Sequence, residues 1–227
     1  MKKTVLTALI FLISFGSFSQ SLQKEVQHPD IAGKMFRNPK GSKSKIQGSP
    51  YTQKMFAAAN VEKINLKAYM RYNVHADEFE FISAKNDTLI LDRLEDFGVI
   101  SFPGLNRKYV LTTYVLGKGK LEYGYLIDVY QKGDFGFFKK ENVVFVDEKV
   151  AKTTLETYMP PKYSKQEDTF FLKNAAAGIV EFPDGKKALT KLFPDKKQAI
   201  EDFLKTNKID FDSEADLIRI VNFLAGS

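Results

Sequence analysis

The sequence predicts an α+β protein with an antiparallel β-meander, strongly coiled or barrel-like, of about eight to ten strands followed by three short C-terminal helices. Two observations predict it. Between Tyr109 and Phe145, residue character alternates with period two across two glycine turns, which is typical of antiparallel strands. After Pro183 the apolar period changes to about 3.6, which is typical of amphipathic helices. Because strands come first and helices last, the two kinds of element should be segregated.

Residues 1–19 have the pattern of a secretory signal peptide and are not expected to belong to the fold. Two lysines follow the first methionine, an apolar run covers 5–13, and Ser17-Phe18-Ser19 places small residues before the cleavage point. The apolar run spans about nine residues, whereas a membrane-spanning helix needs about 20. We therefore expect cleavage before Gln20 and no transmembrane segment after cleavage.

The composition limits the chemistry that is open to this chain. It has no cysteine, which excludes disulfides, thiolate metal sites, thiol catalysis and a lipid anchor on cysteine. Without the two signal lysines, the 34 basic residues become 32 against 28 acidic ones, a net charge of +4. These charges are interspersed except between Lys34 and Lys45, so no nucleic-acid partner is expected.

Residues 20–50 are expected to form a polar and flexible lead-in to the fold. Glycine, proline and serine are spread through this segment, and few of its residues suit a core. Its positive charge leaves an alternative, in which a basic strip lies along an anionic polymer of the envelope. The basic residues are Lys34, Arg37, Lys40, Lys43 and Lys45.

An antiparallel β domain is expected over residues 51–182. Its clearest strand runs from Leu66 to Val74, because apolar residues alternate with mostly polar ones, as in a strand with one buried face. Asn-Asp and Pro-Gly turn sequences separate several of the segments that follow it. Shorter strands are expected at 55–58, 78–81, 88–91 and 97–102.

The meander between Tyr109 and Phe145 is expected to contain three strands in series. Gly117–Lys120 and Lys132-Gly133 are the turns between them. Residues 142–146 either continue the third strand or follow a break at Lys139-Lys140. Beyond the meander, we expect an extended connector at 147–168 and the last strands at 169–173 and 179–182.

Residues 183–227 are expected to form three short helices packed on the sheet. Asp184 is placed to cap the first helix and Asp195 the second, with Gln198 at the spacing of a capping box. Ser213 is placed to cap the third. The apolar stripes that should cover one face or end of the sheet are Ala188, Leu189, Leu192 and Phe193; Ala199, Ile200, Phe203 and Leu204; and Leu217, Ile218, Val221 and Leu224.

Four segments carry a resemblance to known sequences. Tyr69–Phe81 reads RYN…DE.EF, Asp195–Phe203 reads DKK.AIE.F, Gly48–Tyr51 reads GSPY, and Phe170–Lys173 is a short strand that ends in lysine. Together they resemble a group of uncharacterised exported proteins of Bacteroidota-type bacteria over about residues 48–225. The resemblance implies an envelope location and an α+β architecture. It implies no activity and carries over no catalytic residues.

The acidic and histidine residues give a weak case for catalysis. His75, Asp77 and Glu80 are the candidates for an envelope hydrolase, because His75 and Asp77 share a face of a regular strand. The alternative, which we favour, is the solvated end of an amphipathic strand. His28 and His75 have no metal-ligand spacing, so neither a metal nor another cofactor is expected. The sequence contains no G-x-S-x-G, Walker or H-E-x-x-H motif, which also argues against an enzyme.

The meander is rich in tyrosine on both faces of its strands. One interpretation is that one face is core and the C-terminal helices cover the other. The functional interpretation is an aromatic-lined groove or calyx that binds an apolar or carbohydrate ligand. The candidate ligand-binding residues are Tyr114, Tyr123, Tyr125 and Tyr130.

These observations lead us to expect an exported, non-catalytic binding protein of the cell envelope. Its ligand would be a small apolar molecule or another envelope component. The alternatives are the hydrolase above and a structural or assembly accessory that acts through a sheet edge by strand addition. The helical C-terminus does not resemble a β-rich sorting tail, so the chain is expected to be exported to the periplasm, with secretion from the cell as the alternative.

Overall fold

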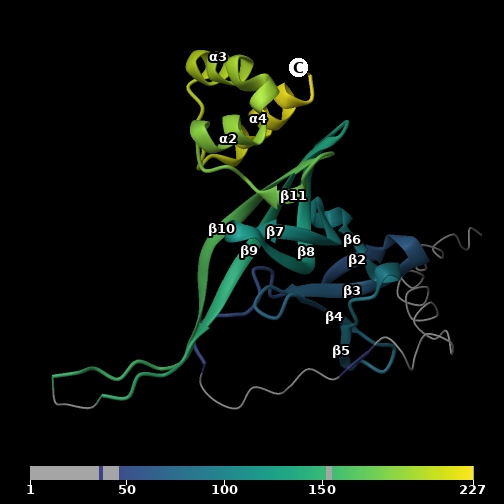
Figure 1. Ribbon diagram of the computed structural model, residues 1–227. Helices are drawn as coiled ribbons and strands as arrows, with labels where there is room; N and C mark the ends of the chain where they lie inside the picture. Colours follow the sequence, from purple (N-terminus) through teal and green to yellow (C-terminus); the bar gives the residue numbers. More distant parts are fainter. Residues whose placement is uncertain (1–35, 38–45, 152–154, 227) are drawn as a thin grey trace, which may run out of the picture.

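The structure, a computed structural model, describes residues 36–37, 46–151 and 155–226, with backbone alone at 36–37 and three α-helices after the last strand (Figure 1). The expected signal peptide, most of the lead-in and His28 lie outside these residues. The helices are α2 (Lys186–Leu192), α3 (Lys197–Asn207) and α4 (Glu214–Leu224). The strands are β1 (Phe36–Arg37), β2 (Ala57–Val61), β3 (Leu66–Asn73), β4 (Glu78–Ile82), β5 (Thr88–Leu91), β6 (Val99–Phe102), β7 (Arg107–Leu116), β8 (Lys120–Lys132), β9 (Phe135–Val146), β10 (Lys162–Asn174) and β11 (Gly178–Glu181).

One 11-stranded sheet contains all the described strands, in the order β1-β5-β4-β3-β2-β6-β7-β11-β10-β9-β8. An additional pairing of β7 with β8 closes β7 to β11 into a ring. Strand pairs are antiparallel except β7 and β11, which meet in a parallel bridge between Val115 and Val180. The predicted α+β class and the barrel-like coiling are therefore confirmed, with closure restricted to the second half of the sheet.

The meander is confirmed as β7, β8 and β9, and residues 142–146 continue β9 without a break. The connector expected at 147–168 is wrong in its second part, because Lys162–Gln166 already belongs to β10 and pairs with Asn142–Val146. The sequence hides this part of the strand because it is charged and a register shift follows Gln166. Charge and a bulge are features that protect a strand edge from unwanted pairing.

Of the three helix caps expected from the sequence, the structure confirms one. Ser213 caps α4 by accepting a hydrogen bond from the Asp216 N–H. The caps expected from Asp184 and Asp195 are wrong, because α2 follows Gly185 and α3 follows Lys196 without a side-chain cap. Pro194 starts a short 3-10 turn that places Asp195 inside the turn instead of before the helix.

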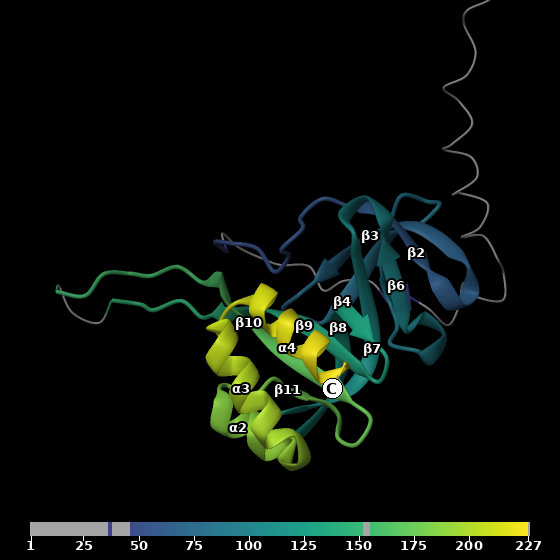
Figure 2. The same cartoon turned by 90° about the horizontal axis from the view of Figure 1, so that it is seen from above.

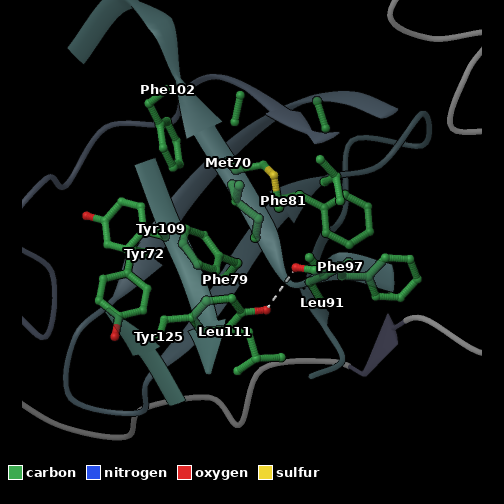
Figure 3. Close-up of a cluster of buried hydrophobic side chains, with 14 of the residues drawn as sticks. Met70, Tyr72, Phe79, Phe81, Leu91, Phe97, Phe102, Tyr109, Leu111 and Tyr125 are labelled. Carbon is green, nitrogen blue, oxygen red and sulfur yellow. Dashed lines mark hydrogen bonds between the residues drawn. The ribbon is translucent and has the colours of Figure 1, made fainter. Parts of the chain in front are cut away.

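Three hydrophobic clusters make up the core of the described part of the chain. The first packs side chains of β2–β6 against Tyr109 and Leu111 of β7, Tyr125 and Ile127 of β8, and Val143 of β9. Figure 3 shows many of its side chains. The second lies between the helices and the ring, where Phe137 and Leu172 contact residues such as Leu217 and Val221. The third contains Tyr114 of β7, Leu126 of β8, Phe138 of β9 and Phe171 of β10, and therefore fills the ring.

Strand alternation explains why the clusters are separate. Tyr125 and Ile127 of β8 belong to the first cluster, whereas Leu126 between them belongs to the cluster inside the ring. Neighbouring Phe137 and Phe138 of β9 are divided in the same way.

The helices lie together over β8–β10, and α4 contacts β9 and β8 (Figure 2). Of the helices in the described part of the chain, none is long and apolar enough to cross a membrane.

A hairpin arm leaves the body where β9 ends and β10 begins. We define the arm as residues 144–151 and 155–161, and Figure 1 shows it extending away from the rest of the molecule. A bridge between Lys149 and Met159 holds its two sides together. At its base, the Gln47 N–H donates to the Pro161 carbonyl at 2.9 Å, so the described end of the lead-in lies against β10.

Candidate functional site

His75, Asp77 and Glu80 lie at the hairpin of β3 and β4 but do not form one cluster. Among the described residues, no hydrogen bond or ion pair joins any two of them. His75 Nδ1 lies 3.1 Å from the Val143 carbonyl oxygen, and the imidazole packs 5.2 Å from the Tyr163 ring centroid. His75 therefore connects the hairpin to β9 and β10.

Asp77 is a half-buried carboxylate that several groups hold in place. It accepts hydrogen bonds from the Tyr72 hydroxyl and, at 3.2 Å, from the Tyr125 N–H. The Lys140 ammonium lies 3.3 Å away and the Arg93 guanidinium 3.4 Å away. These partners come from β3, β8, β9 and the segment after β5, so Asp77 links both halves of the sheet.

Glu80 is buried, with 2% of its surface exposed, and is paired with Arg71. Arg71 Nε and Nη2 donate to Glu80 Oε2 at 2.9 and 2.7 Å. The Tyr51 hydroxyl donates to the other oxygen at 2.7 Å. The pKa of Tyr51 is raised above its usual value, mainly by burial and then by this hydrogen bond.

Two of the three predicted hydrolase residues have charged partners inside the fold. Asp77 is neutralised by Arg93 and Lys140, and Glu80 by Arg71. A general base must have a lone pair that faces the substrate, whereas these carboxylates face strands of their own fold. In the described part of the chain, no three acidic or histidine side chains lie close enough to hold a metal ion.

The four predicted ligand-binding tyrosines are not brought together. Tyr125 is buried in the first cluster, where its hydroxyl donates to the Phe97 carbonyl at 3.4 Å (Figure 3). Tyr114 is buried inside the ring, with its ring centroid 4.9 Å from that of Phe171. Tyr130 faces α4 and donates to Asn222 at 3.4 Å, and Tyr123 is 48% exposed. The structure therefore places the four tyrosines in different surroundings.

Sequence reasoning missed a buried ion pair between Arg107 of β7 and Glu141 of β9. Only 4% of the Glu141 surface is exposed, and Arg107 Nη1 lies 3.2 Å from Glu141 Oε1. The second oxygen, Oε2, has no hydrogen-bond partner among the described residues. One signal could have revealed it, because Glu141 occupies the alternation phase of the apolar Phe137 and Val143 in β9.

Two hollows lie near Arg107. A small pocket of about 10 Å³ is lined by both members of the ion pair and by Tyr109. A wider, more open hollow of about 240 Å³ shares Phe102 and Arg107 with it. The other residues that line the wider hollow are Ser101, Pro103, Asn106, Lys108, Asp128 and Val129.

Exposed apolar side chains concentrate on the arm. In the described part of the chain, 12 large apolar side chains are exposed, and half of them lie between 144 and 159. Leu155 is 96% exposed, more than any of the others. The arm residues of this group are Val144, Val146, Val150, Leu155, Tyr158 and Met159.

The chain was compared with known families, proteins and structures. No family model, curated protein or solved structure matches it. In the part of the chain that the structure describes, half of the exposed large apolar side chains lie on the arm. Three buried side-chain atoms of the described residues have no hydrogen-bond partner: Glu141 Oε2, Asp168 Oδ1 and Asn174 Nδ2.

Proposed function

We propose that this chain is a non-catalytic, periplasmic binding protein of the cell envelope and that its arm binds another polypeptide. The observation that carries the proposal is the concentration of exposed apolar side chains on the arm. Of the expected ligands, this favours an envelope component over a small apolar molecule. A small apolar ligand needs a concave apolar pocket, whereas the wider hollow at Arg107 is lined largely by polar residues.

The arm exposes apolar surface that the fold itself does not bury. An isolated two-stranded ribbon is only marginally stable in water, because no layer packs against it. Contiguous exposed apolar surface usually marks an interaction site. Full burial of a Leu or Val side chain contributes about 1.5–3 kcal/mol. Burial of Val150 and Leu155 against a partner would therefore supply a substantial part of the binding free energy.

The backbone of the arm indicates how the partner binds. Beyond the last β9–β10 pair, Val146 and Lys162, the main chains of the two described sides of the arm exchange hydrogen bonds at Lys149 and Met159, at 2.8 and 2.9 Å. One side-chain hydrogen bond, from the Tyr158 hydroxyl to Glu148, also joins the two sides. Strands with unpaired N–H and C=O groups accept an additional strand. Pro160 and Pro161 have no N–H, so we place the added strand along residues 147–151.

The charge of the arm favours a polypeptide over a lipid surface. Asp147, Glu148 and Glu156 outnumber Lys149 in the described arm. Anionic lipid headgroups attract basic segments and repel acidic ones. Main-chain pairing also requires main-chain groups in the partner, which lipids lack. An extended segment of another protein, with apolar side chains at alternate positions, meets both conditions.

The N-terminal pattern supports the proposed location. The basic, apolar and small-residue regions of 1–19 are typical of export. Fractionation of the producing cells should place the mature chain in the periplasmic fraction. Recovery of the whole amount from the culture medium would contradict this location.

Photo-crosslinking in the producing cells tests the interaction. A photoreactive residue at Leu155 should give an adduct with one polypeptide of defined mass. The same residue at Leu121, which is 68% exposed in the turn between β7 and β8, serves as the control and should give none. Equal yields at both positions, or adducts with lipid alone, would contradict the proposal.

The oligomeric state separates a different protein from a second copy of the chain. Sedimentation of the purified mature chain should show a monomer. Val150→Ser and Leu155→Ser should leave both this state and the unfolding midpoint unchanged, because neither side chain packs in a core cluster. A dimer that dissociates in these variants would show that the arm serves self-association, and would overturn the proposal of a separate partner.

A further inference from the structure

The outer edge of β9 has no neighbouring strand in the described sheet where the chain enters the arm. The pairing of β9 with β8 ends at Lys139, and beyond this point β10, on the other side, is the strand that pairs with β9. His75 Nδ1 lies 3.1 Å from the Val143 carbonyl oxygen, so the body of the protein covers this edge as far as Val143. The edge that follows Val143 is where a strand of another chain can pair.

The opposite edge of the arm is less suited to an added strand. At the base of the arm, the Tyr163 N–H donates to the Gln47 carbonyl at 2.9 Å, so the described end of the lead-in already pairs with β10. Pro160 and Pro161 come just before this point and have no N–H to donate. An added strand is therefore better placed along 147–151.

Register and one hydrogen bond show which side chains an added strand would meet. Lys149 pairs with Met159, so Val150 lies opposite Tyr158 on one face of the arm. The Tyr158 hydroxyl donates to Glu148 Oε2 at 3.0 Å, which places Glu148 on the same face. Val150 is 60% exposed and Tyr158 is 51% exposed. This face therefore presents a carboxylate beside two exposed apolar side chains.

The charge of Glu148 is not compensated by the residues that the structure describes. Among them, no ion pair involves Glu148. Lys149, the basic residue of the described arm, occupies the alternate strand position and therefore lies on the other face. Residues directly opposite each other on paired strands have Cβ atoms about 5 Å apart, so opposite charges there are favourable and like charges are unfavourable. A cation of the partner is the group that suits this position.

We propose that the polypeptide bound by the arm carries a lysine or arginine opposite Glu148 and an apolar residue two positions away, opposite Val150. This inference rests on the function proposed for the arm and names the class of segment that the arm selects. The spacing follows from the period of two in a strand, because residues 148 and 150 share a face and their partners must do the same.

Crosslinking in the producing cells tests the role of Glu148. With the photoreactive residue at Leu155, Glu148→Lys should lower the yield of the polypeptide adduct about fivefold, because an attractive cross-strand pair becomes a repulsive one. Glu167→Lys is the matched control, since it makes the same charge change at an exposed position of β10, and it should leave the yield unchanged. Equal yields from the two variants would overturn the basic partner residue but not the binding of a polypeptide. Absence of the adduct from the unaltered chain would contradict both.

Two synthetic peptides test the chemistry of the partner on the purified mature chain. Each has nine residues, with valine two positions from the centre on either side, so that both strand directions fit, and threonine elsewhere. The central residue is lysine in one peptide and glutamate in the other. Fluorescence anisotropy at low salt should show about fivefold tighter binding of the lysine peptide, and Glu148→Lys should reverse this order. Binding of neither peptide, or an order that the variant does not reverse, would overturn the proposal.

Discussion

At the scale of the residue, the polar side chains of the β3–β4 hairpin explain how the two halves of the sheet are joined. Asp77 adopts a φ of 55° in the turn and accepts a hydrogen bond from the Tyr125 N–H in β8. A side chain at Gly124 would overlap the Asp77 carboxylate. The fold therefore requires glycine at this strand position because of a neighbour that is distant in sequence.

Gly124→Ala should lower the free energy of unfolding by about 1–3 kcal/mol, because the new methyl group forces the Asp77 carboxylate from its partners. Denaturant titration followed by circular dichroism measures this change. Gly104→Ala is the control, since a Cβ there would meet no atom within 4 Å. Equal midpoints for the two variants would show that the Asp77 contact does not constrain β8.

Glu80→Ala should destabilise the fold by about 3–5 kcal/mol, because it leaves the half-buried Arg71 guanidinium without its carboxylate. The matched control is Glu95→Ala, which removes an exposed partner of Lys63 and should change stability by less than about 1 kcal/mol. Thermal unfolding of both variants makes the comparison. A stable Glu80→Ala protein would show that the fold does not need Glu80, and Glu80 would again be a candidate functional residue.

The buried tyrosines predict loss of stability in alkali. Burial, and then the charge of Asp77, raises the pKa of Tyr72 well above its usual value. Burial raises that of Tyr109 to about 12. Because these pKa values are higher in the folded chain than the usual 10, the stabilisation is complete below pH 10 and is lost as the pH rises toward 12.

Urea titrations across this alkaline range, with tyrosinate absorbance as the second signal, should show the midpoint falling as tyrosine ionises. Tyr109→Phe should reduce this pH dependence, since phenylalanine cannot ionise. A midpoint that stays constant from pH 10 to about 12 would contradict burial of these hydroxyls.

At the scale of the element, sequence patterns predict strands that have one clear apolar face and miss those that do not. β3 and β8 show regular alternation, and the structure places both where it was expected. The first part of β10 is charged because it forms an irregular strand edge, so its sequence looks like a connector. Helix caps fail for a similar reason, because a turn such as Pro194–Lys196 shifts the start of α3 by a few residues.

Ser213→Ala should destabilise α4 and with it the cluster between the helices and the ring, by about 1 kcal/mol. Asp184→Ala is the control, because α2 has no side-chain cap and Asp184 is exposed. Chemical denaturation compares the two variants. A larger effect of Asp184→Ala than of Ser213→Ala would mean that the caps are assigned to the wrong helices.

At the scale of the whole molecule, ring closure could not be predicted from sequence. The bridge between Val115 and Val180 joins strands that are far apart in the chain, and no local pattern reports such a pairing. The candidate sites were hidden for the same reason. Glu141 is buried in an ion pair with Arg107, which lies on another strand. The sequence of the arm likewise does not indicate that the arm extends away from the rest of the molecule.

Amide hydrogen exchange tests the central claim, that the arm binds a polypeptide as an added strand. In the purified chain, the amides of 147–151 should exchange rapidly, with the exception of Lys149, which donates to Met159. In the complex obtained through the Leu155 crosslink, the amides of Glu148 and Val150, which point away from Met159, should become protected, while those of the turn at Gly117–Gly119 should not change. Exchange at Glu148 and Val150 that is equally fast in the free chain and in the complex would contradict the claim.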